Sequence, residues 1–207
     1  MMHKLTYDEI QHRRLSEAEA ATTEKRMPVI AILENIRSLY NVGSIFRTSD
    51  GARLEAVYTV GYTPHPPRPE IEKTALGATR TVPSSHFETI KQAIAEIRTP
   101  IGRMEFGSST RVEGARVEGA IPGTPPRPYK IAALEISSES RSVFSLHSLD
   151  FPLALIIGNE ITGVSDEAIA LCDFTLEIPM LGAKHSLNVA VAFGIAAFEC
   201  VRCMDIV

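Results

Sequence analysis

The sequence predicts an α/β protein built on a mainly parallel β-sheet with helices on its faces. Apolar runs rich in β-branched residues alternate along the chain with amphipathic, helix-like segments. Polar and glycine-rich stretches follow several of the apolar runs. Because ligands of parallel sheets bind beyond the carboxyl ends of the strands, we expect the functional residues in these stretches.

The elements follow from this pattern in chain order. The first 27 residues are polar and charged, which predicts an exposed N-terminal arm or helix, followed by one domain from 28 to 207. A stretch with four prolines, 62–69, predicts a loop. Strands are expected at 28–33, 56–60, 129–135, 153–157 and 174–178, and helices at 41–54, 86–97, 165–171 and from about Ser186 onward.

An insertion is predicted at about 100–128. It contains the unit Arg-Val-Glu-Gly-Ala twice in succession, at 111–115 and 116–120, among glycines and prolines. Such a segment has little apolar surface to bury, so we expect a flexible surface loop with no assigned chemistry.

Bulk composition excludes several classes of protein. The 207 residues are 44% hydrophobic and 22% charged, which suits one soluble globular domain. The sequence shows no membrane-spanning run and no signal-peptide core near its start, so we expect a cytoplasmic protein. The net charge of −4 means that any nucleic acid must be bound by a local basic patch.

The three cysteines predict no metal site. Cys200 and Cys203 form a C-x-x-C pair, but a zinc site would need two more ligands at matching spacing. The pair falls late in an apolar, helix-like run. Together with Cys172, these residues are interpreted as reduced cysteines, those of the pair buried in a helix.

Several individual residues each allow a structural and a functional interpretation. Gly158 ends a strand, where a glycine admits a ligand close to the backbone or simply makes a turn. Ser186 is a candidate N-cap of the last helix, with Asn188 in its first turn. Arg47 lies among apolar residues of a helix, where it is either a structural arginine or a functional one.

Three segments in order resemble the motifs of the SpoU/TrmH-type ribose methyltransferases of the SPOUT superfamily. They are 41–48 (NVGSIFRT), 158–164 (GNEITGV) continuing to 178–180 (IPM), and 182–192 (GAKHSLNVAVA). The resemblance covers the chain from Pro28 to its end, apart from the insertion. One such motif alone is weakly specific, whereas three in order are strongly specific.

The resemblance implies both a fold and an activity. It implies an α/β domain with a C-terminal trefoil knot, a homodimer with catalytic centres near the subunit interface, and S-adenosylmethionine as methyl donor. The implied reaction is methylation of a ribose 2′-hydroxyl in RNA, with tRNA the first candidate and rRNA the second. Two alternatives stay open: a non-catalytic RNA-binding module that retains the fold, and a methyltransferase with a different substrate.

The resemblance also assigns site residues. It implies that the cofactor is held by backbone atoms around Gly158, Ile178, Met180 and Leu187, with Glu135 as a neighbour. The catalytic candidates that it implies are Arg47, Asn41, Glu160, Ser186 and Asn188.

Arg47 is the first candidate for the chemical step. A ribose hydroxyl is a poor nucleophile, so an enzyme must align it with the methyl group and help to remove its proton. The resemblance implies that Arg47 is the base, with an RNA phosphate contributing, and that Asn41 positions Arg47 or the ribose. Because an arginine side chain has a pKa above about 12, binding a phosphate and orienting the hydroxyl is an equally good role.

The chain departs from the family pattern at a few positions. Ser49, Gly51, Arg53 and Ala190 replace residues that are common there, which puts the end of the 41–54 helix in doubt but not Arg47. The candidate RNA contacts are Arg13, Arg14, Arg37, Arg68, Lys73 and Arg80.

Overall fold

The computed structural model describes residues 3–21, 26–98 and 128–204. The predicted insertion lies almost wholly outside the described residues and stays a prediction. Within them, seven strands form one sheet in the order β3-β2-β1-β6-β4-β7-β5, and every neighbouring pair is parallel. The strands are β1 (Met27–Glu34), β2 (Leu54–Val60), β3 (Ser84–Phe87), β4 (Lys130–Leu134), β5 (Arg141–Ser142), β6 (Leu153–Ile157) and β7 (Phe174–Glu177).

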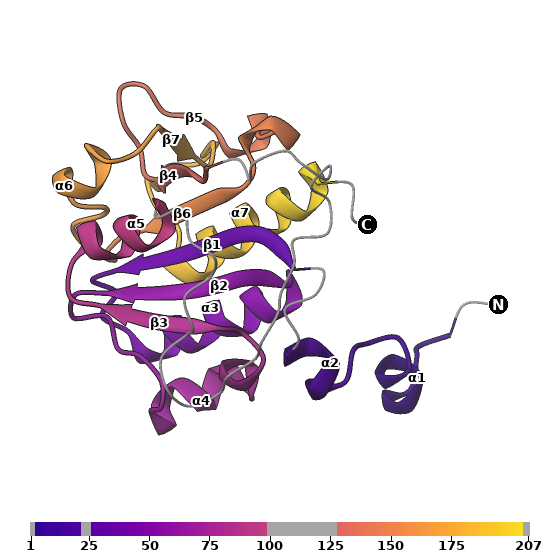
Figure 1. Cartoon of the computed structure of the whole chain (residues 1–207). Helices are drawn as coiled ribbons and strands as arrows, with labels where there is room; N and C mark the ends of the chain where they lie inside the picture. Colours follow the sequence, from indigo (N-terminus) through magenta and orange to yellow (C-terminus); the bar gives the residue numbers. More distant parts are fainter. Residues whose placement is uncertain (1–2, 22–25, 99–127, 205–207) are drawn as a thin grey trace, which may run out of the picture.

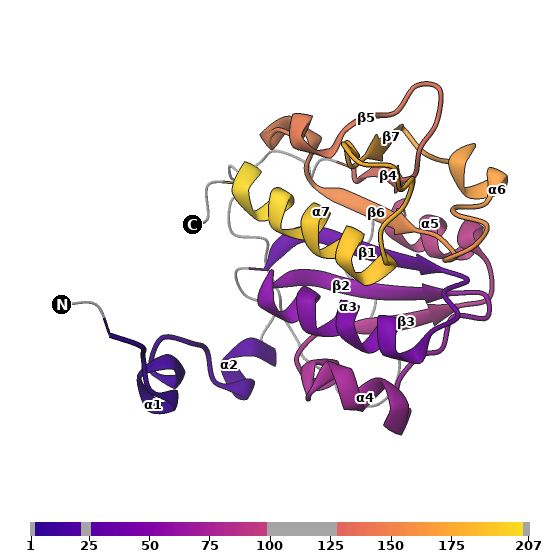
Figure 2. The ribbon, with the colours of Figure 1, turned by 180° about the vertical axis from the view of Figure 1, so that it is seen from behind.

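Helices cover both faces of the sheet, which confirms the predicted fold class. Figures 1 and 2 show α3 and α7 on one face and α5 on the other. The α-helices are α1 (Tyr7–Gln11), α2 (Glu17–Ala21), α3 (Leu39–Gly51), α4 (Pro69–Ala75), α5 (Ile90–Arg98), α6 (Asp166–Ile169) and α7 (Val189–Cys203). Short 3-10 turns are η1 (Ala78–Arg80), η2 (Val143–Ser145) and η3 (Ser148–Asp150).

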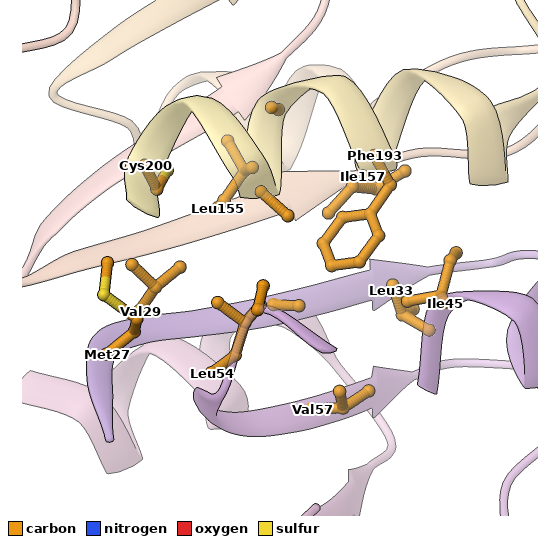
Figure 3. Close-up of a cluster of buried hydrophobic side chains, with 14 of the residues drawn as sticks. Met27, Val29, Leu33, Ile45, Leu54, Val57, Leu155, Ile157, Phe193 and Cys200 are labelled. Atoms are coloured by element: carbon orange, nitrogen blue, oxygen red, sulfur yellow. The ribbon is translucent and has the colours of Figure 1, made fainter. Parts of the chain in front are cut away.

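The core consists of two apolar layers, because successive side chains of a strand point to opposite faces. In β1, Val29 and Leu33 join the layer beneath α3, α4 and α7, whereas Ile30 and Ile32 join the layer beneath α5 and α6. Figure 3 shows side chains of α7, Phe193 among them, directed toward those of β1, β6 and α3. The central strands β1, β2, β4 and β6 are therefore apolar on both faces, which explains their continuous hydrophobic runs.

The N-terminal arm contributes nothing to this core. Helices α1 and α2 contain no buried residue, and they lie to one side of the sheet domain (Figure 1). The first buried residue of the core is Met27, close to the predicted boundary.

Three boundaries differ from the prediction by three residues or more. The helix expected from His86 begins at Ile90, because Ser84–Phe87 form the edge strand β3. The helix expected to reach Leu54 ends at Gly51, and Leu54 starts β2. The last helix begins at Val189, three residues later than expected. Strands β3 and β5 and helix α4 were not predicted at all.

The strand order places a switch point between β1 and β6. From β1 the chain proceeds outward through β2 and β3. It then crosses to the other side of β1, where the remaining strands lie in the spatial order β6, β4, β7 and β5. Leu33 of β1 pairs with Ile157 of β6, so the segments after these residues leave the sheet together. Such a switch point is where open parallel sheets bind ligands.

No helix in the described ranges is long and apolar enough to cross a membrane.

Candidate functional site at the ends of β1 and β6

A chain of hydrogen bonds joins residues from all three sequence motifs at this switch point. The Asn41 side chain donates from Nδ2 to Oε1 of Glu160 over 3.0 Å. The Asn188 side chain donates from Nδ2 to Oδ1 of Asn41 over 3.2 Å. Asn41 thus forms one polar cluster with two residues that lie more than a hundred positions away in the sequence.

Glu160 is the centre of the cluster. In addition to Asn41, its carboxylate accepts the backbone N–H of Arg37 at 3.0 Å and that of Ser38 at 3.2 Å. Burial opposes ionisation, but hydrogen bonds from Arg37, Asn41 and Ser38 outweigh it, so the pKa of Glu160 lies below its ordinary value. The loop after β6 and the turn before α3 are therefore held together by an ionised carboxylate.

Asn188 is the N-cap of α7, a role that was expected for Ser186. Its side-chain oxygen accepts the N–H of Ala190 at 2.9 Å and, more weakly, that of Val191 at 3.4 Å. Asparagine is as good an N-cap as serine, and the helix begins after Asn188, which was predicted to lie in its first turn. Ser186 is exposed and forms no hydrogen bond with another described residue, so the structure does not bring it into the cluster.

Arg47 lies outside the cluster. Its side chain is exposed on α3, and it has no hydrogen bond or ion pair with another described residue. It follows Asn41 by six positions, about 9 Å along the helix axis, and the two side chains form no hydrogen bond. Its guanidinium is open to solvent on the helix whose first turn carries Asn41.

Gly158 is required by the chain's own loop. A Cβ atom at Gly158 would overlap the carbonyl of Gly163 and the nitrogen of Val164. Asn159 and Gly163 close the loop through two backbone hydrogen bonds of 3.0 and 2.9 Å. Of the two readings of Gly158, the tight turn is thus the one that these contacts account for.

Glu135 supports the same loop from β4. Its carboxylate accepts the N–H of Val164 at 2.8 Å and that of Ile136 at 3.0 Å. It also lies against Gly163, whose φ of +71° and lack of a Cβ permit this approach.

The segment from Ile178 to Leu187 has backbone groups that are free to bind a ligand. None of its residues forms a hydrogen bond with another described residue. Ile178 and Met180 are half-buried, whereas Leu181 is fully exposed and Leu187 is 37% exposed. Free backbone donors and acceptors beside apolar side chains are what a nucleoside-containing ligand would bind.

Comparison with known proteins identifies the family. The model of the SpoU rRNA methylase family matches residues 28–198, which include all three motifs and exclude the arm. The chain belongs to this family.

Curated relatives carry related names. The chain is 26% identical over 176 residues to a putative TrmH family tRNA/rRNA methyltransferase of Staphylococcus haemolyticus, covering 85% of this chain and 59% of that protein. It is also 26% identical over 196 residues to the tRNA (guanosine(18)-2′-O)-methyltransferase of Aquifex aeolicus, covering 93% and 78%. The chain spans less than two thirds of the length of several other relatives, among them the 23S rRNA (guanosine-2′-O-)-methyltransferase of Pseudomonas putida.

Solved structures share the fold. The A. aeolicus TrmH/SpoU tRNA modifying enzyme superposes with a TM-score of 0.68 at 24% identity, covering 90% of this chain and 80% of that one. The SpoU methyltransferase AviRb from Streptomyces viridochromogenes gives 0.66 at 23% identity, covering 87% and 61%.

Cations without a partner gather on one part of this SpoU-family domain. Among the described residues from Arg26 onward, the cationic side chains with no hydrogen bond or ion pair to another described residue are Arg37, Arg47, Arg68, Lys73 and Lys184. All belong to α3, α4 or loops beyond the strands' carboxyl ends. Arg80, also a candidate RNA contact, is instead paired with Glu17 of the arm at 2.9 Å.

Sequence reasoning assigned no role to two buried polar residues near the cluster. Buried Glu34 ends β1 and accepts the N–H and hydroxyl of Ser165 at 3.0 and 2.6 Å. Buried Asn159 donates to the carbonyl oxygen of Asn35 and to the hydroxyl of Tyr62. Their position in the sequence could have indicated a role, because Glu34 and Asn159 are polar residues at the ends of buried strands.

Cys200 is buried on α7, as the sequence predicted, whereas Cys203, predicted to be buried as well, is half-buried at the end of the same helix. All three cysteines are free thiols. Burial raises the pKa of the Cys200 thiol to about 12, so it is an inert core residue.

Proposed function

We propose that the protein transfers a methyl group from S-adenosylmethionine to a ribose 2′-hydroxyl in RNA. The observation that carries the proposal is the Glu160–Asn41–Asn188 cluster, because it joins the three family motifs at the sheet's switch point. The relatives' names support the reaction class. We take tRNA as the first candidate substrate, since the Aquifex tRNA methyltransferase matches this chain over most of both lengths, and rRNA as the second.

We assign methyl-donor binding to the backbone of Gly158, Ile178, Met180 and Leu187. The fit is supported by the unsatisfied backbone groups and apolar side chains of 178–187. Glu135 contributes by holding the 159–164 loop in place. The bound donor would supply a sulfonium methyl group that is already activated for attack.

The polar cluster would act on the ribose. Glu160 and Asn188 hold the Asn41 amide, which leaves little freedom for groups that position a hydroxyl for in-line attack. Arg47 would bind an RNA phosphate and orient the hydroxyl, or take its proton, as the reaction requires. Ser186 stays a candidate for ordering the donor-binding loop.

A transfer assay tests the proposal. The protein is incubated with methyl-labelled S-adenosylmethionine and bulk tRNA or rRNA, beside Arg47→Ala and the control Arg98→Ala, which changes an exposed arginine at the end of α5. We expect label in RNA with the wild type and the control. Arg47→Ala should lower the rate by about two to three orders of magnitude while leaving donor affinity unchanged.

The alternatives give different results in the same assay. Donor binding without transfer to RNA would indicate a methyltransferase with another substrate. Absence of donor binding would indicate an RNA-binding module that retains the fold.

We further propose a cytoplasmic homodimer with a C-terminal trefoil knot, as the family resemblance implies. The exposed apolar side chains Leu181, Val191 and Phe198, on and before α7, support a subunit interface there.

A further inference from the structure

Tyr62 is an exposed aromatic residue whose position is fixed by hydrogen bonds at its hydroxyl and its backbone N–H. Its hydroxyl accepts a hydrogen bond from Nδ2 of Asn159 at 2.7 Å, and its backbone N–H donates to Oδ1 of Asn35 at 3.3 Å. Nevertheless 62% of its surface is open to solvent. A tyrosine held in this way can stack on a ligand with little loss of side-chain freedom.

The residues that hold Tyr62 connect it directly to the site. Asn159 precedes Glu160, and its Nδ2 also donates to the carbonyl oxygen of Asn35 at 2.8 Å. Asn35 in turn lies two residues before Arg37, whose N–H binds Glu160. The two residues that hold Tyr62 are therefore next to, or two positions from, residues that form or bind the Glu160–Asn41–Asn188 cluster at the switch point.

The surroundings of Tyr62 suit a polyanion that carries flat rings. Arg37 lies two residues after Asn35, and Arg68 lies in the same loop as Tyr62; both side chains are exposed and have no hydrogen bond or ion pair with another described residue. In the same loop, His65 stacks on His86 with ring centroids 4.1 Å apart. Aromatic faces beside unpaired cations are the recognition chemistry of single-stranded nucleic acids.

We propose that Tyr62 is a stacking platform for an unpaired base of the RNA substrate, next to the ribose presented to the Glu160 cluster. Asn159 is the positioning residue that fixes the platform. The location beside the methylated ribose rests on the proposed function, whereas the contact with RNA does not depend on methyl transfer.

A fluorescent substitution tests the contact directly. The chain contains no tryptophan, so Tyr62→Trp introduces a single tryptophan, which can be excited selectively and whose fluorescence stacking on a base would quench. We expect saturable quenching by bulk tRNA and none by heparin, which is polyanionic but has no bases. The matched control is Phe144→Trp, which replaces an aromatic residue that is 54% exposed after β5, at the opposite edge of the sheet. Quenching of both variants alike, or of neither while tRNA binds, overturns the proposal.

Three further substitutions separate stacking from a structural role. Tyr62→Phe retains the ring without the hydroxyl, Tyr62→Leu retains apolar bulk, and Tyr62→Ala removes both. We expect the Kd for tRNA to rise about five- to 150-fold in the Leu and Ala variants and to change much less in the Phe variant. Donor affinity and melting temperature should stay close to wild type in the Leu variant. Equal tRNA affinity of the Leu and Phe variants contradicts stacking.

The design separates this inference from the proposed function. If the wild type methylates RNA but Tyr62→Leu keeps its KM for RNA, only the stacking proposal fails. If Tyr62→Trp is quenched by tRNA but the wild type transfers no methyl group, only the proposed function fails.

Discussion

At the scale of single residues, the geometry of the site depends on one carboxylate. Glu160 accepts three hydrogen bonds from two backbone N–H groups and one amide, all from the segment that leads into α3. A carboxylate serves here because every neighbouring group is a donor. The side chain thus fixes the position of Asn41, which in turn binds Asn188.

Glu160→Gln is expected to destabilise the protein and to remove part of its pH dependence. The amide would turn an NH₂ group toward a donor, so the free energy of unfolding should fall by about 1 kcal/mol at neutral pH. In the wild type the pKa of Glu160 is lowered in the folded state, so its stabilisation is present above the ordinary glutamate value of 4.5. It is lost as the pH falls from there through the folded pKa.

Urea unfolding at about pH 7 and about pH 4 measures both effects. The control is Glu139→Gln, because the exposed Glu139 side chain has no hydrogen bond or ion pair with another described residue. If the two variants show the same pH dependence as the wild type, Glu160 does not have the assigned role.

The resemblance indicated the cluster's members but not its connections. It named Asn41, Glu160 and Asn188, whereas the hydrogen bond from Asn159 to the Tyr62 hydroxyl, and the bonds of both residues to Asn35, arise only in the folded chain. Ser186 and Asn188 are both good capping residues, so sequence alone could not decide which begins α7. In the folded chain the cap is Asn188, whose side chain also donates a hydrogen bond to Asn41.

At the scale of elements, α3 owes its place to a glycine in the first motif. A Cβ atom at Gly43 would overlap Oγ1 of Thr74 and the carbonyl oxygen of Ile71, both on α4. The Thr74 hydroxyl also donates to the carbonyl oxygen of Tyr40 at 3.0 Å. This close contact between helices accounts for Gly43 without a ligand.

Gly43→Ala is therefore expected to lower the free energy of unfolding by about 1–3 kcal/mol. Gly51→Ala on the same helix is the matched control, because its Cβ would meet only the ring of Phe198 at an ordinary 3.9 Å. The control should be neutral or more stable by up to about 1 kcal/mol, since alanine favours helix. Urea denaturation decides, and equal stability of the two variants would contradict the packing argument.

The elements that sequence predicted are those with a long apolar signal. Strands β1, β2, β4 and β6 are buried on both faces and were found within a few residues of their observed ends. The edge strand β3 is half-buried throughout and reads Ser-Ser-His-Phe, so it carries no hydrophobic pattern. Helix α4 begins at the last proline of the predicted loop, a position that suits proline but is not visible as periodicity.

At the scale of the whole molecule, the acidic chain has to bind RNA through a local surface. The net charge is −4, yet within the described part of the sheet domain the unpartnered cations lie on α3, on α4 and in the loops beyond the strands. The other described cations of the domain are held by partners, such as Lys91 by Glu167 and Lys130 by Asp150. The attraction of such a local group of cations for RNA acts only at short range.

The N-terminal arm carries further exposed cations, beside the amino ends of β1–β3 (Figure 1). Arg13 and Arg14 are exposed and have no side-chain partner among the described residues, and neither α1 nor α2 contributes to the core. Replacing both arginines with alanine should therefore leave the free energy of unfolding unchanged. If each contacts one phosphate, the slope of log Kobs for tRNA against log salt concentration should become shallower by about 1.8.

Filter binding of tRNA across a salt series measures this slope. A second variant, Glu17→Gln, tests how the position of the arm on the domain affects tRNA binding. Glu17 holds Arg80 at 2.9 Å, so its loss frees one cation and loosens the contact between arm and domain. If the double variant binds tRNA with the wild-type slope, the arm does not touch RNA and the binding surface is confined to the sheet domain.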